Sequence, residues 1–156
     1  MRKNLCALSI LSASVLLAAT AARAETGAYI MATPNDLKWS DVGSLPPGAK
    51  LAVIEGPMNE AVPITARLKL PANYQIPAHW HPGVERVTVL SGSFNYGMGD
   101  KLDSQKTSSL GAGSIIIMQP KMSHFGWTSE ETILQLNTTG PWGITYVNPA
   151  DDPRKK

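Results

Sequence analysis

Three histidines and one glutamate have the spacing of a metal site. The only histidines in the 156-residue chain are His79, His81 and His124, and Glu85 follows His81 by four residues. Residues two apart on a strand point the same way, so His79 and His81 project together. Glu85 follows both histidines by an even number of residues, after a Pro-Gly break in the strand. Three imidazoles and one carboxylate form a borderline donor set suited to Fe(II), Mn(II), Ni(II), Cu(II) or Zn(II).

The third histidine follows a short apolar strand. Gly113 opens that stretch, Pro120 ends it, and His124 comes four residues after the proline. A glycine turn, a strand and a proline turn would carry the histidine back towards the first pair.

These two stretches resemble the two cupin motifs. His79 and His81, with Glu85 after three further residues and Gly92 after six more, match the first motif. Gly113, Pro120 and His124 resemble the second. One departure is that Met122 and Thr128 stand where the second motif often has a glycine and an asparagine, but neither position is a ligand.

The chain is similar to small single-domain bacterial cupins from about residue 37 to residue 149, and above all to the cupin domain of ChrR-type anti-sigma factors. The resemblance implies a double-stranded β-helix, the jelly-roll barrel of cupins. It also implies one divalent transition-metal ion (Fe, Mn, Zn, Ni or Cu) inside the barrel, bound by His79, His81, Glu85 and His124. Small cupins are usually homodimers, and residues 29–42 are the segment that we expect to cross to a partner.

The rest of the chain agrees with an all-β, single-domain fold. Short runs of β-branched and aromatic residues alternate with breakers among the 13 glycines and 12 prolines. The predicted strands are 50–56, 62–70, 86–90, 93–98, 114–118, 131–138 and 143–147. Strict alternation in 64–70 predicts one buried face. The uniformly apolar run 114–118 predicts a strand covered on both sides.

The first 24 residues are predicted to be a cleaved signal peptide, leaving a cupin domain at 25–156. A basic start and an apolar run lead to Ala22-Arg23-Ala24, which ends in the small residues that a signal peptidase reads. The run is shorter than the roughly 20 residues of a membrane span. We therefore expect a periplasmic or secreted protein with no membrane segment in its mature form.

Removing the signal peptide changes the charge and the thiol content. The mature chain keeps 11 basic residues against 12 acidic ones, and the only cysteine, Cys6, is lost. Nothing then indicates nucleic-acid binding. Thiolate metal sites and cysteine nucleophiles are excluded from the mature chain.

The aromatic and polar residues near the motifs are expected to have structural roles. Trp80 should point to the opposite face from its histidine neighbours. Phe125 and Trp127 are expected to line or close the barrel wall. Tyr74, Tyr96 and Gln135 could supply polar groups behind the ligands. Each of them is expected to be an ordinary strand residue.

Two functions from different classes remain open. In the first, which is favoured, the protein is a metal-dependent oxygenase-like or isomerase-like enzyme. Its small oxygen-rich substrate, such as a β-diketone, a catechol-like diol or a hydroxy or keto acid, would chelate at the two positions that four protein ligands leave open on an octahedral ion. In the second, it is a non-catalytic periplasmic module that binds or senses a metal or small molecule.

Overall fold

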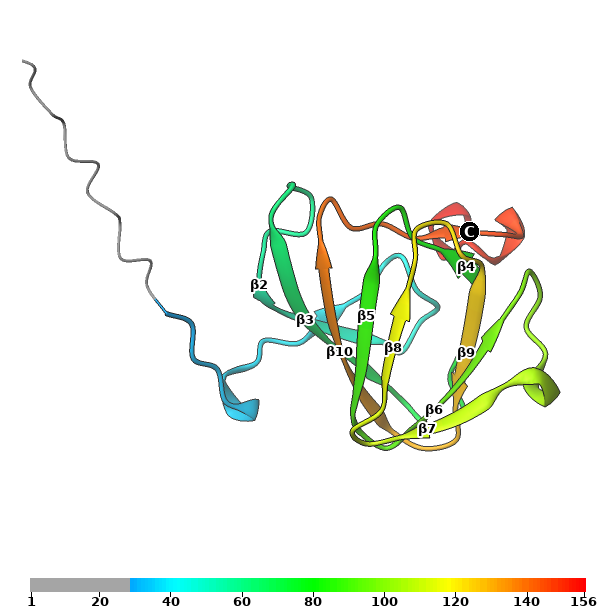
Figure 1. Cartoon of the computed structure of the whole chain (residues 1–156), viewed down its shortest axis with the longest axis horizontal. Helices are drawn as coiled ribbons and strands as arrows, with labels where there is room; N and C mark the ends of the chain where they lie inside the picture. The colour runs from blue at the N-terminus through cyan, green and yellow to red at the C-terminus, as the bar shows by residue number, and fades with distance from the viewer. Residues whose placement is uncertain (1–28) are drawn as a thin grey trace, which may run out of the picture.

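Two antiparallel sheets face each other in the computed structural model, which describes residues 29–156 (Figure 1). The predicted signal peptide, 1–24, and the first residues of the predicted domain lie outside the described residues. The larger sheet has the order β1 (Ser40–Asp41), β2 (Lys50–Glu55), β3 (Pro63–Leu70), β10 (Thr132–Thr139), β5 (Glu85–Ser91), β8 (Ile115–Met118). The smaller has the order β11 (Thr145–Tyr146), β4 (Gln75–Trp80), β9 (His124–Thr128), β6 (Ser93–Met98), β7 (Ser108–Gly111).

From β3 onward the chain crosses repeatedly between the two sheets, which is the winding of a jelly-roll barrel. The helices of the described residues are 3₁₀ turns of three residues each: η1 (Pro34–Asp36), η2 (Ser104–Lys106), η3 (Pro149–Asp151) and η4 (Pro153–Lys155). Within 29–156 no helix is long and apolar enough to cross a membrane. The prediction of a single all-β domain is confirmed.

The buried face of β3 follows the predicted alternation. Ile64, Ala66, Leu68 and Leu70 are all buried, and the residues between them are only partly covered. Opposite them on β10 lie Leu134 and Leu136, paired in register with Leu68 and Ala66. Period-two patterning therefore places this apolar row between the sheets, where it forms much of the core.

The prediction for 114–118 is wrong in one respect. β8 is the edge strand of the larger sheet and pairs with β5. Met118 faces the core, but Ile115 and Ile117 are 59% and 55% exposed. An apolar run shows that a strand tolerates burial on both faces, but the layer that would cover the outer face must come from elsewhere.

Gly92 forms the tight turn between β5 and β6. Its φ is +74°, and a Cβ added there would lie 2.5 Å from the carbonyl oxygen of Glu131. Both facts demand glycine, because other residues pay for a positive φ and no side chain fits. The turn reverses the chain directly after the strand that begins with Glu85, and so passes it from the larger sheet to the smaller one.

Candidate metal centre

The four predicted ligands come together between the two sheets. His79 lies near the end of β4 and His81 follows that strand, while His124 begins β9. β4 and β9 are neighbours, and their register pairs His79 with His124. Glu85 begins β5 in the opposite sheet. All four side chains are buried.

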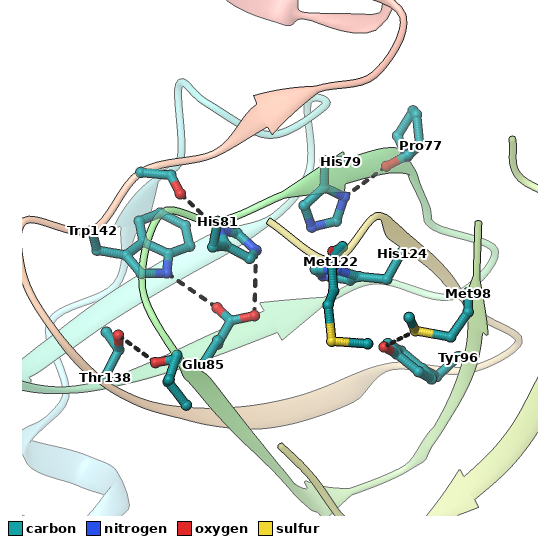
Figure 2. Close-up of polar contacts among 12 residues, drawn as sticks. Pro77, His79, His81, Glu85, Tyr96, Met98, Met122, His124, Thr138 and Trp142 are labelled. Atoms are coloured by element: carbon teal, nitrogen blue, oxygen red, sulfur yellow. Dashed lines mark hydrogen bonds and ion pairs between the residues drawn. The ribbon is translucent and has the colours of Figure 1, made fainter. Parts of the chain in front are cut away.

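The three imidazoles form a compact cluster (Figure 2). One nitrogen from each ring lies within 4.8 Å of the other two. The ring centroids are 4.3 Å apart for His79 and His124 and 5.0 Å apart for His79 and His81. Every histidine of the chain therefore contributes to one buried group that could hold a metal ion.

Backbone carbonyl groups fix the orientation of each ring. The Nδ1 atoms of His79, His81 and His124 lie 2.7, 2.7 and 2.9 Å from the carbonyl oxygens of Pro77, Gly143 and Met122. A carbonyl only accepts, so each Nδ1 carries the proton and donates. Each Nε2 then keeps its lone pair free. This is the tautomer and the partner that metal-ligating histidines usually have.

The histidines are also held in the neutral form. Burial lowers the pKa of all three, and the pKa of His79 lies well below its ordinary value because His124 and His81 add to the effect of burial. Charging one imidazole here would cost solvation and repel its neighbours. Only neutral imidazole ligates a metal, so the cluster stays competent below the pH at which free histidine protonates.

Glu85 stands beside this cluster, outside the group of three. Its Oε2 lies 3.3 Å from His81 Nε2, and its Oε1 accepts a hydrogen bond of 3.1 Å from Trp142 Nε1. Burial raises the pKa of the carboxyl, while His124 and the Trp142 hydrogen bond partly oppose that rise. Metal ligation by the four residues stays a prediction, but their donor chemistry fits a divalent transition metal.

The cavity around these groups is small and mostly apolar. Its volume is about 40 Å³, enough for an ion with a few waters, since one water needs roughly 10–15 Å³. Besides the four predicted ligands its wall is largely aliphatic and aromatic, and no lysine or arginine of residues 29–156 lines it. Such a wall offers no cation to pair with a multiply charged substrate.

Tyr96 supplies a hydroxyl in this wall. Its ring centroid lies 5.7 Å from that of His124, and its hydroxyl donates to Met98 Sδ at 2.7 Å. Burial, with a smaller effect of Glu85, raises the pKa of Tyr96 to about 12. The phenol is therefore a proton donor at neutral pH. Of the three polar candidates from the sequence, Tyr96 lines the cavity, and Tyr74 and Gln135 do not.

Sequence reasoning missed Trp142, which contacts two of the predicted ligands. It lies in the turn between β10 and β11, and no motif marks it. Trp80, Phe125 and Trp127 are absent from the cavity wall. For Trp80 this agrees with the expected outward direction. Phe125 is fully buried, but it packs against Gly97 on the neighbouring strand.

Comparison with known families decides the classification. Residues 27–142 match the family described as the ChrR cupin-like domain. The chain belongs to this cupin family. No curated protein matches this cupin in sequence.

Solved structures agree with the cupin fold. The polyketide cyclase RemF from Streptomyces resistomycificus superposes with a TM-score of 0.68 at 16% identity, covering 82% of this chain and 92% of that one. A salicylate 1,2-dioxygenase from Pseudoaminobacter salicylatoxidans gives 0.53 at 13% identity, over 64% of this chain and 29% of that one. At these identities the likeness concerns the fold alone.

The anti-sigma ChrR, in complex with SigE from Rhodobacter sphaeroides, is more similar in sequence. It gives a TM-score of 0.51 at 25% identity, over 68% of this chain and 51% of that one. This cupin thus spans about half of that chain's length.

Proposed function

We propose that the protein is an exported, mononuclear metal-dependent enzyme that acts on a small, oxygen-rich chelating substrate. The observation that carries the proposal is the set of three buried imidazoles with free Nε2 atoms beside the buried carboxylate of Glu85. A metal ion bound there would act as a Lewis acid, lowering the pKa of a chelating substrate and orienting it. The solved structures with a similar fold include a cyclase and a dioxygenase, which supports the proposal of an enzyme.

The surrounding residues have separate tasks in this proposal. The backbone carbonyls behind the imidazoles hold the ligand tautomer, and Glu85 supplies a negative charge that would offset part of an ion's charge. Tyr96 keeps its phenolic proton, and a substrate oxygen would replace Met98 Sδ as the acceptor of its hydrogen bond. A bound substrate would displace water from this mostly apolar wall, which would strengthen each of these interactions.

The substrate would present little more than its chelating oxygens to the cavity. A volume of about 40 Å³ leaves no room beside an ion for a large organic group. Among the residues that the structure describes, the wall also lacks the basic side chains that a phosphate or a polycarboxylate would need. A β-diketone, a catechol-like diol or a keto acid, entering with its two oxygens first, satisfies both conditions.

A second candidate is a non-catalytic module that binds or senses a metal or a small molecule. The small cavity favours it, because an ion and its waters already fill such a space. The similarity to the anti-sigma ChrR also favours it.

One experiment separates the two candidates. Protein purified from its own compartment is analysed for metals, and its cobalt form is then titrated with a panel of chelating carbonyl compounds and diols. The enzyme proposal expects a shift of the cobalt visible spectrum with at least one compound, and metal-dependent oxygen uptake or isomerisation of that compound with the native metal. Stoichiometric metal with no spectral shift and no turnover across the panel would favour the binding module.

A further inference from the structure

The turn between β10 and β11 holds two of the predicted ligands at once. Trp142 Nε1 donates to Glu85 Oε1 at 3.1 Å, and the indole stacks on the His81 ring with centroids 5.2 Å apart and planes 23° apart. The next residue, Gly143, accepts the His81 Nδ1–H through its carbonyl at 2.7 Å. Figure 2 shows the indole and the imidazole side by side above the carboxylate.

This turn is itself fixed from behind. The backbone N–H of Trp142 donates to the Met58 carbonyl at 2.8 Å, and that of Gly140 donates to the Val62 carbonyl at 2.9 Å. A Cβ at Gly140 would lie 2.1 Å from the Glu60 carbonyl oxygen, so the two backbones touch. The indole is therefore presented to Glu85 from a rigid support instead of a free loop.

The two oxygens of Glu85 consequently differ. Oε1 is occupied by the indole N–H, whereas Oε2 points to His81 Nε2 at 3.3 Å. Ligand atoms bonded to one ion at about 2.1 Å each lie about 3 Å apart when they are adjacent. The 3.3 Å separation therefore suits two neighbouring ligands of one ion.

We propose that Trp142 is a positioning residue that restricts Glu85 to binding the metal through Oε2 alone, while its ring fixes His81. The proposal rests on the metal site described under the proposed function. A carboxylate that binds through one oxygen takes one coordination position, and a carboxylate that binds through both takes two. Trp142 thus keeps one more position free for the two oxygens of a chelating substrate.

A double-mutant cycle tests this with Co(II) as the probe. Wild type, Trp142→Phe, Glu85→Ala and the double variant are titrated with Co(II) in competition with a chromogenic chelator, and their visible spectra are recorded. Phenylalanine keeps the stacking and removes the N–H. We expect Trp142→Phe to weaken Co(II) binding about 10- to 100-fold and to change the spectrum. In the Glu85→Ala background the same change should alter the affinity less than about twofold, because the indole acts through the carboxylate.

Trp80→Phe is the matched control, since it makes the same chemical change between two of the histidines but away from the cavity wall. It should leave affinity and spectrum unchanged. An unchanged Trp142→Phe variant would overturn the role of Trp142 while leaving the metal site standing. An equal loss in both Glu85 backgrounds would also overturn it, since that is the result of a general packing defect. Wild type that takes up no Co(II) would instead remove the proposed function.

Infrared spectroscopy of the wild type gives a measurement that does not depend on the folding of a Trp142 variant. The difference between metal-loaded and metal-free spectra contains the two carboxylate stretching bands of Glu85, and Glu85→Gln identifies them. Binding through one oxygen separates these bands more widely than binding through two. A wide separation supports the proposal, and a narrow one contradicts it.

Discussion

His79 and His124 are direct partners across two neighbouring strands, although 45 positions of sequence separate them. Their rings lie 4.3 Å apart, and each Nδ1 donates to a carbonyl two residues before it. The pair is thus oriented in the same way by the same local device on each strand. Pairing of β4 with β9 therefore decides whether the site exists at all.

The site's pH response follows from burial of the imidazoles. Their pKa values are lowered, so in the metal-free protein the unfolded state binds more protons below its own histidine pKa, near 6.5. The histidines' contribution to the free energy of unfolding of the metal-free protein should be largest above about pH 6.5 and fall as the pH drops towards the lowered values. As the pH falls, metal affinity should begin to decrease only at a pH below the one at which free imidazole becomes protonated. Thermal melts and Zn(II) titrations between pH 5 and pH 8 would check this, and affinity that halves already at pH 7 would contradict it.

Glu85→Gln should have opposite effects on the metal-free and metal-loaded protein. Glutamine keeps the shape and removes the one anionic ligand, so metal affinity should fall at least about tenfold. Burial raises the pKa of Glu85. A raised folded pKa contributes stability below the unfolded value near 4.5, and that contribution is lost as the pH rises through the folded value. Glutamine carries no such loss.

The metal-free Glu85→Gln variant should therefore melt no lower than metal-free wild type at pH 8, and the metal-loaded variant should melt lower than metal-loaded wild type. Calorimetry with and without a chelator measures both. A lower melting temperature in the absence of metal would show that the Trp142 hydrogen bond to the charged carboxylate outweighs its burial.

Much of the fold was predictable from patterning, and the site from motifs. The strand 93–98 was predicted with the bounds that the structure shows. Ile64, Ala66, Leu68 and Leu70 were assigned to the buried face correctly, because the alternation that predicts it is local. The exposure of Ile115 and Ile117 could not be predicted, since it depends on which strand lies at the edge of the sheet. The role of Trp142 could not be predicted either, because its contact with Glu85 joins residues 57 positions apart and leaves no periodic pattern in the sequence.

Export remains a prediction. The basic start, the apolar run and the Ala22-Arg23-Ala24 sequence predict cleavage after Ala24. Natively expressed protein should therefore begin at Glu25 and be found in the periplasm or outside the cell. Intact-mass measurement after fractionation decides this, and a cytoplasmic chain that retains Met1 would refute it.

The homodimer also remains a prediction. Tyr29, Ile30 and Met31 are 85%, 61% and 78% exposed, and Figure 1 shows their segment running away from the barrel. Apolar side chains left uncovered in this way suit contact with a second copy. Light scattering of the mature protein should give twice the chain mass at micromolar concentration, and a variant that starts at residue 39 should give the monomer mass. A monomeric mature protein would count against the dimer.

Metal stoichiometry is the most direct test of the central claim. Wild type, His79→Ala, His81→Ala, Glu85→Ala, His124→Ala and the control Trp80→Phe are loaded with Zn(II), desalted and analysed. One equivalent is expected for wild type and Trp80→Phe, and much less for the four alanine variants, because a mononuclear site has no spare ligand. Added metal should raise the melting temperature of the first two only. If His81→Ala or His124→Ala keeps a full equivalent with unchanged melting temperature, the site is wrong and the enzymatic proposal falls with it.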